Sequence, residues 1–175
     1  MKIWRKGLVA MWKVRDMDCV FFETAIVSKN LSQHIMIEAV PLPKEVGDMA
    51  PIYFKKALSE TGSEWSSYRK IIDLSKEGKG NVQNIVPKGF SYFRIDFGLQ
   101  NGFVHVIDNE EKFSTSFAHE ILCGMLDLDC KYWRKMNNLP LEKQIEKRDF
   151  LKREWFNGFD WTERAKASLQ YNDDS

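Results

Sequence analysis

The sequence predicts an α+β protein, in which short strands and amphipathic helices alternate along 175 residues. Two observations lead to this prediction. Stretches with alternating apolar and polar residues are typical of strands, and other stretches place apolar residues at helical spacing. The apolar fraction of 43% supports a chain that buries a core. We expect an antiparallel sheet with helices, followed by a smaller α+β domain with a β-hairpin and C-terminal helices.

Overall charge and cysteine content exclude several classes of protein. The chain has 26 basic and 25 acidic residues, so its net charge of +1 gives no overall field that attracts nucleic acid. Its three cysteines are unevenly spaced and form no Cys-x-x-Cys pair, which fits a reducing compartment. No apolar run reaches the roughly 18 residues of a membrane span, and no signal peptide is recognisable. We therefore expect no membrane partner.

The N-terminal part predicts a helix followed by two strands. Apolar side chains recur at helical spacing over 3–16, which indicates an amphipathic helix. The stretch 18–27 is rich in Val, Phe and Thr and predicts a strand. A polar link then leads into an alternating strand within 34–43, and we expect Pro41-Leu42-Pro43 to end it.

A second helix is predicted to begin near Asp48, whose carboxylate can cap it, with Pro51 in the first turn. Its expected buried stripe consists of Tyr53, Phe54, Ala57 and Leu58. The segment 61–80 is polar and contains glycine, so we interpret it as a connector packed on the surface. Its expected anchors are Trp65, Tyr68, Ile71 and Ile72.

The C-terminal part predicts a hairpin and two helices. The alternation over 90–97 separates Phe93, Ile95 and Phe97 from Tyr92, Arg94 and Asp96, which face the other side. Asn101-Gly102 marks a turn into a strand over 103–107. Ser114 or Ser116 can cap the helix that follows, and a mixed-charge helix covers 141–155. The predicted division is therefore 1–60, a connector over 61–86, and 87–175.

The stretch from His34 to Pro43 is where catalytic chemistry would be expected. On an alternating strand, His34, Met36 and Glu38 project from one face. This ladder resembles the active-site strand of the histidine-triad nucleotide hydrolases and transferases, which reads His-x-His-x-His. The middle histidine of that family is the nucleophile, whereas Met36 offers only a thioether. The resemblance implies a degenerate triad with no catalytic residue, in which 1–60 is the second half of a histidine-triad-like domain and its first strands have no counterpart.

Longer segments resemble one family. The chain is similar to the C-terminal region of the CwfJ-like spliceosomal proteins, which include the cofactor of the lariat-debranching enzyme. The similarity runs from about Ile3 to Thr162 and rests on residues 18–24, 41–57, 87–93, 96–100, 102–107, 124–128, 133–135 and 159–162.

The resemblance implies a nuclear protein of late spliceosomes, in which 87–175 is a second CwfJ-like domain. Expected partners are spliceosomal proteins, intron RNA or the lariat, and the lariat-debranching enzyme; no cofactor is expected. The family's Cys-x-x-Cys pair, which resembles a zinc site, belongs to the part without counterpart. His34 would be a further ligand there, but this chain supplies no partner cysteines, so no metal site is expected.

The three histidines share no metal-ligand spacing. His34 is either a polar residue on a half-buried strand or a vestigial ligand or phosphate contact. We expect His105 to be a hydrogen-bonded core residue, because it shares a strand face with apolar side chains, and His119 to be exposed on a helix. Glu38 would repel a phosphate.

Five cations flank aromatic residues on the hairpin and on the loop before the last helix. Such cations hold single-stranded RNA when stacking rings lie nearby, although equally numerous carboxylates leave a mixed-charge surface as the alternative. The predicted RNA-binding residues are Arg94, Lys112, Lys131, Arg134 and Lys135.

Three functions are open, the first of which is implied by the family resemblance together with the thioether of Met36. The first is a non-catalytic RNA- and protein-binding component of the late spliceosome. The second is an active nucleotide hydrolase or transferase that uses His34 or His105 as nucleophile. The third is a pure protein-interaction module, whose anchors would be Trp4, Trp12, Trp133 and Trp155.

Overall fold

The computed structural model describes residues 2–27, 35–61, 71–76, 82–129, 131, 138–156, 159 and 162. The chain forms two compact units, one made of 1–16 and 137–175 and the other of 17–136. Helices and an antiparallel sheet confirm the predicted α+β class. Within the described part of the chain, no helix is both long enough and apolar enough to cross a membrane.

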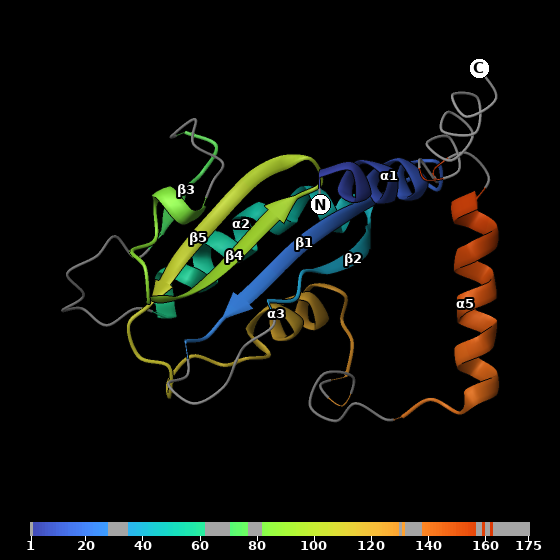
Figure 1. The fold of residues 1–175 in the computed structure, drawn as a ribbon. Coiled ribbons are helices and arrows are strands. Elements are labelled where there is room, and N and C mark those ends of the chain that lie inside the picture. The colour runs from blue at the N-terminus through green and yellow to red at the C-terminus, as the bar shows by residue number, and fades with distance from the viewer. Residues whose placement is uncertain are drawn as a thin grey trace, which may run out of the picture. The chain divides into compact units, whose positions relative to one another are not determined.

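A five-stranded sheet organises the larger unit, with strand order β2-β1-β4-β5-β3 and antiparallel neighbours throughout (Figure 1). The strands are β1 (Met17–Ala25), β2 (Glu38–Pro43), β3 (Ile72–Asp73), β4 (Ser91–Phe97) and β5 (Gln100–Ile107). The division into 1–60 and 87–175 stays a prediction about domains. In the structure, β1 from the first of these segments pairs with β4 from the second.

Two helices cover one face of this sheet. They are α2 (Lys44–Thr61) and α3 (Phe117–Met125), and Figure 1 views the sheet from the opposite side, with α2 behind β4 and β5. Phe93 of β4 is fully buried, and its ring centroid lies 6.5 Å from that of Phe54 and 5.1 Å from that of Phe117. Burial of large apolar side chains here supplies the main stabilisation of the unit, about 1.5–3 kcal/mol for each.

The other face of β5 is covered by the segment predicted to be a surface connector. This segment forms β3 and the short 3-10 helix η1 (Val82–Asn84). Leu74, Val82 and Val86 are buried there against Val104 and Val106. The connector stays a prediction. The burial of these three side chains was not foreseen, because scattered single apolar positions gave no periodic signal.

The strand predicted within 34–43 begins later and ends later than expected. β2 starts at Glu38, so residues 35–37 lie outside it, and it includes Pro41 and Pro43. Proline is tolerated on an edge strand, because only one side of the strand needs backbone donors. Cys19 of β1 is the partner of Pro41, and no strand pairs with the outer side of β2 in the described sheet.

The predicted start of α2 at Asp48 is also wrong. α2 begins at Lys44, directly after β2, so Pro51 lies inside the helix and the carbonyl of Gly47 lacks its usual intrahelical donor. The helix persists because Ala50, Phe54 and Leu58 are all buried against the sheet. Packing therefore outweighs the local cost of the proline.

The hairpin turn lies at Gly98-Leu99 rather than at the predicted Asn101-Gly102. Gly98 has a φ of +57°, a conformation that glycine adopts without strain. Gly102 lies within β5, beside an irregular register between Ile95 and Phe97, and its N–H donates to Asp96 Oδ1 at 3.1 Å. Gly102 is thus a close-approach residue rather than a turn residue.

The smaller unit contains α1 (Lys2–Lys13) and α5 (Leu141–Phe156), and both agree with the predicted helices. The Trp4 and Trp155 rings stack with centroids 5.3 Å apart and planes 14° apart. Arg15 forms an ion pair with Glu154, and its guanidinium lies 4.9 Å from the ring centroid of Phe150. An aromatic stack therefore joins the two helices, and an ion pair joins the turn after α1 to α5.

Gly102→Ala is expected to destabilise the protein by about 1–3 kcal/mol. A Cβ atom at this position would lie 2.4 Å from the carbonyl oxygen of Ile95, so the two strands would have to separate. Urea unfolding followed by circular dichroism measures the change. Gly124→Ala is the matched control, because its Cβ meets nothing within 4 Å and alanine favours a helix. Equal unfolding free energies for the two variants would contradict the close-approach role.

Candidate functional site

Of the two predicted triad positions that the structure describes, Glu38 lies on a strand and Met36 does not. Met36 precedes β2 and is 66% exposed, whereas Glu38 is the first residue of β2. His34 lies outside the described residues. A single strand face that carries Met36 and Glu38 together is therefore wrong, because the strand has not yet begun at Met36.

The carboxylate of Glu38 pairs with a histidine from a distant part of the chain. His119 Nε2 of α3 lies 3.0 Å from Glu38 Oε2, and both side chains are about two-thirds buried, with exposed fractions of 26% and 31%. The imidazole also meets the ring of Phe22 edge-on, at a centroid distance of 5.3 Å. The prediction that His119 is exposed is thus wrong. The third predicted triad position is therefore a carboxylate, Glu38, that contacts the imidazole of His119 in α3.

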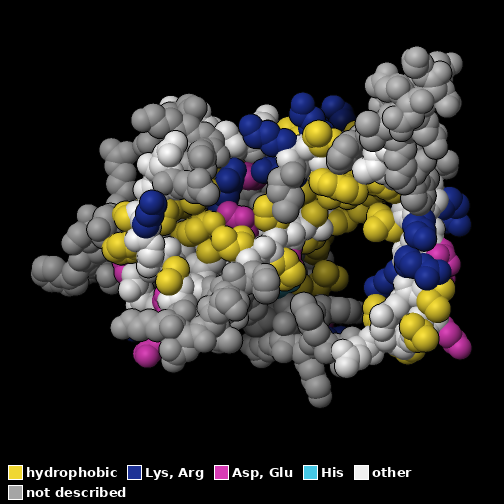
Figure 2. All heavy atoms as spheres, in the orientation of Figure 1, with side chains coloured by type: hydrophobic (Ala, Val, Ile, Leu, Met, Phe, Trp, Pro, Cys, Tyr) yellow, Lys and Arg dark blue, Asp and Glu magenta, His cyan; other side chains and the backbone are white. Residues whose placement is uncertain are grey.

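A polar cluster lies on the sheet face opposite α2. Tyr92 Oη donates to Glu23 Oε1 at 3.1 Å, and Arg94 Nη2 donates to Asp96 Oδ2 at 2.9 Å. Glu23 also faces Arg94 directly in the register of β1 and β4. Figure 2 shows acidic and basic side chains next to one another on this face. Burial, and next the Glu23 carboxylate, raise the pKa of Tyr92 to about 12.

The predicted RNA-binding cations do not share one surface. The Arg94 side chain is only 17% exposed and forms an ion pair with Asp96, on the face of the sheet opposite α2. Lys112 follows β5 and lines a pocket with His105 and Ile107, which face the helix-covered side. Lys131 is 69% exposed and its Nζ lies 3.1 Å from Asp129 Oδ2. Arg134 and Lys135 lie outside the described residues.

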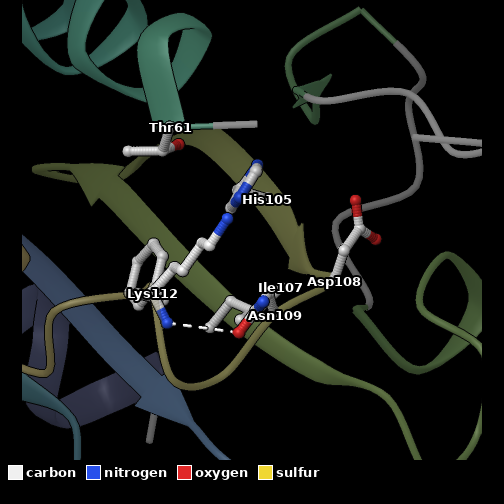
Figure 3. Close-up of a pocket in the computed structure, with 7 residues that line it drawn as sticks. Thr61, His105, Ile107, Asp108, Asn109 and Lys112 are labelled. Carbon is white, nitrogen blue, oxygen red and sulfur yellow. Dashed lines mark hydrogen bonds between the residues drawn. The ribbon is translucent and has the colours of Figure 1, made fainter. Parts of the chain in front are cut away.

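The pocket is a cavity of about 250 Å³ at one end of the sheet. Its lining residues come from the end of α2, from β5 and from the loop that follows: Thr61, His105, Ile107, Asp108, Asn109, Lys112 and Phe113. In Figure 3 the Lys112 side chain extends toward His105, and Asp108 lies on the other side of that ring. His105 is 4% exposed and stacks on Phe113 at 5.9 Å, which confirms that it is buried.

Sequence reasoning did not single out this pocket. Thr61, Asp108 and Asn109 are polar residues at the ends of elements, where polar residues are common for reasons of local structure. They form a group only in the structure, where they line one pocket together with Lys112 at the end of β5. Among the described residues, no group of three or more His, Cys, Asp or Glu is placed to hold a metal ion.

Comparison with known proteins now identifies the family. Residues 1–55 match the family model described as "protein similar to CwfJ C-terminal", and residues 64–162 match "protein similar to CwfJ C-terminus 2". The chain belongs to the CwfJ-like family. The first matched region contains β1 and β2, and the second contains β3, β4 and β5, so the CwfJ-like sheet is assembled from both regions.

Individual relatives of this CwfJ-like chain cover nearly all of it. The CWF19-like protein 2 homolog of Caenorhabditis elegans is 45% identical over 95% of the chain, and human CWF19-like protein 2 is 44% identical over 92%. The pre-mRNA-splicing factor cwf19 of Schizosaccharomyces pombe is 30% identical over 90%. The chain spans 35%, 17% and 25% of the lengths of these three relatives, respectively.

The Tyr92 phenol is expected to titrate near pH 12 rather than near its ordinary value of about 10. The pKa of Tyr92 is higher in the folded than in the unfolded chain, so the protonated phenol contributes to the stability of the fold. This contribution is complete below pH 10 and is lost as the pH rises toward 12. The difference between the phenolate absorbance titrations of the native chain and of Tyr92→Phe isolates the group. The control is Tyr53→Phe, which removes an exposed tyrosine. A difference curve for Tyr92 centred near pH 10 would contradict the assignment.

Proposed function

We propose that this chain is a non-catalytic RNA- and protein-binding component of the late, intron-lariat spliceosome, which acts in the nucleus in pre-mRNA splicing and lariat turnover. The observation that supports it most strongly is the match over 90% of the chain to a protein named pre-mRNA-splicing factor cwf19. The chain spans 25% of that relative, so the proposed role is that of one part of a splicing factor.

Two features of the triad positions support the absence of catalysis. Met36 has no nitrogen or oxygen lone pair with which to attack phosphorus. Glu38 is engaged by His119, so its carboxylate occupies the third position with a negative charge that disfavours a phosphate. Both features support a scaffold that binds and does not cleave.

Local clusters of charge support RNA binding despite the low net charge. α1 contains Lys2, Arg5, Lys6 and Lys13 and no acidic residue. Lys131 is largely exposed in the larger unit. Phosphate contacts by such side chains fix an RNA strand without reading its sequence. We propose that spliceosomal proteins and the lariat-debranching enzyme bind alongside the intron RNA.

A specific observation favours a second candidate, a pure protein-interaction module. α5 exposes the apolar side chains Leu141, Ile145, Phe150 and Leu151. Figure 2 shows hydrophobic side chains next to charged ones at this helix. Of the tryptophans predicted as anchors, Trp155 is buried within its own unit, and Trp4 stacks on it. Crosslinking of the chain to intron RNA in nuclear extract separates the two candidates, because a pure protein module would give no RNA crosslink.

Affinity for single-stranded or branched RNA is expected to fall as salt rises from 50 to 200 mM. The logarithm of the binding constant should fall against the logarithm of salt concentration with a slope of about −0.7 for each phosphate contact on a single strand. Lys131→Met should make this slope shallower by about 0.7. Fluorescence anisotropy with labelled RNA measures both.

The matched control for Lys131→Met is Lys56→Met, which removes an exposed cation from α2 that was not predicted to contact RNA. Its salt dependence should equal that of the native chain. An absence of RNA binding at 50 mM salt, together with no spliceosomal proteins recovered from nuclear extract, would refute the proposed function.

No turnover is expected when the purified chain is incubated with an adenylylated amine, a substrate type of histidine-triad enzymes. The reason is that the thioether of Met36 cannot form the phosphorus-linked intermediate. Release of AMP, measured by chromatography, should equal that of a buffer blank. Turnover that disappears in His34→Ala or His105→Ala, with the circular dichroism spectrum unchanged, would instead establish the hydrolase or transferase alternative.

A further inference from the structure

We propose that the pocket at the end of β5 binds one unstacked nucleobase of a single-stranded RNA. This inference deepens the proposed RNA-binding function and rests on it. It concerns a place in the sheet that differs from the triad positions, because β2 is one edge strand while β5 lies at the opposite side, next to β3.

The size and the walls of the pocket fit a single flat ring system. Its volume of about 250 Å³ lies just below the range of about 300–1,000 Å³ that is typical of sites for drug-sized ligands. Ile107 and Phe113 supply apolar wall, whereas Thr61, Asp108 and Asn109 supply polar groups. A ligand with apolar faces and a polar edge matches this combination. Nucleobases have this character, and proteins that bind single-stranded RNA receive splayed bases in such pockets.

The polar groups of the pocket include both donors and acceptors. Asn109 Oδ1 accepts hydrogen bonds from the backbone N–H groups of Glu111 at 3.0 Å and Lys112 at 3.2 Å, the second of which is dashed in Figure 3. The amide nitrogen of Asn109 is therefore the part of that side chain that can donate to a ligand. The Lys112 ammonium is also a donor, while the Asp108 carboxylate is an acceptor.

Thr61, the last residue of α2, adds a further acceptor. Its hydroxyl donates to the carbonyl of Leu58 at 2.9 Å, so the hydroxyl oxygen has lone pairs to offer. The edge of a nucleobase presents carbonyl or ring-nitrogen acceptors next to N–H donors. The pocket can thus pair with both kinds of group on one base. Asn109 and Lys112 can donate to its acceptors, and Asp108 and Thr61 can accept from its N–H groups.

Electrostatics favour a neutral base over a phosphate in this pocket. Asp108 brings a negative charge that offsets the single positive charge of Lys112. Thr61 is the last residue of α2, and the C-terminal end of a helix has a partial negative charge. A dianionic phosphate would meet repulsion from both. The RNA phosphates would instead lie outside the pocket.

The test uses the whole chain labelled with ¹⁵N and four free nucleosides, which have no phosphate. Titration should shift the backbone amide resonances of Glu111 and Lys112 in a saturable way for at least one nucleoside. Asp108→Asn, which keeps the shape and removes the charge, should weaken this binding about tenfold. Asn109→Asp keeps the acceptor of the loop, removes the donor and should weaken it similarly. Lys56→Met, a change of an exposed α2 residue outside the pocket lining, should have no effect.

Two further arms distinguish the failure of this inference from the failure of RNA binding. If inorganic phosphate shifts the same amides and no nucleoside does, the pocket is a phosphate site and the inference is overturned. If an intact RNA strand and an abasic strand of equal length bind equally well, RNA binding stands but no base enters the pocket. If a nucleoside binds and neither strand does at 50 mM salt, the nucleobase pocket stands and the proposed RNA function fails.

Discussion

The pairing of β1 with β4 is the interaction on which the rest of the larger unit depends. Six residue pairs, from Val20 with Phe97 to Ala25 with Tyr92, join strands that are far apart in the sequence. This pairing places Phe22 beside Phe93 in the core, with ring centroids 6.5 Å apart. Without it, the apolar faces of α2 and α3 would have no common surface to cover. The sheet that α2 and α3 cover is therefore built from both of the regions matched by separate family models.

The same pairing explains why charged residues occur on the face of the sheet opposite α2. Glu23 and Asp96 are almost fully buried, and an unpaired buried carboxylate is costly. In the observed register, Glu23 lies opposite Arg94 and accepts from Tyr92, while Arg94 engages Asp96. A slip of one residue would turn these side chains into the aromatic core. The polar cluster thus selects one register, and this accounts for Arg94 more directly than RNA binding does.

Local patterns were sufficient to predict the elements whose periodicity is strong. The alternation of Phe93, Ile95 and Phe97 with polar residues, and the helical spacing in α1 and α3, all appear in the structure as expected. Predictions based on proline and glycine were wrong where tertiary structure, rather than local conformation, explains the residue. Pro41 and Pro43 belong to a strand because β2 is at an edge, and Gly102 marks a close approach rather than a turn.

Contacts between distant residues could not be predicted in the same way. His119 and Glu38 are 81 positions apart, and no spacing rule relates them. The pocket likewise combines Thr61 at the end of one helix with a loop that begins at Asp108. Each of these residues has an ordinary local explanation, so only the path of the sheet reveals the grouping. Such groups of distant residues are set by the topology of the sheet and not by the spacing of residues along the sequence.

The contact between Glu38 and His119 shows how one edge of the sheet is joined to a helix. In a histidine-triad enzyme the third position would face a phosphate, whereas here the Glu38 carboxylate lies against His119 and helps to attach α3 to the edge of the sheet. The opposite end of the sheet, at β5, offers the cavity with unassigned donors and acceptors. Binding at that end does not require the triad positions, because β1 and β4 separate the two places.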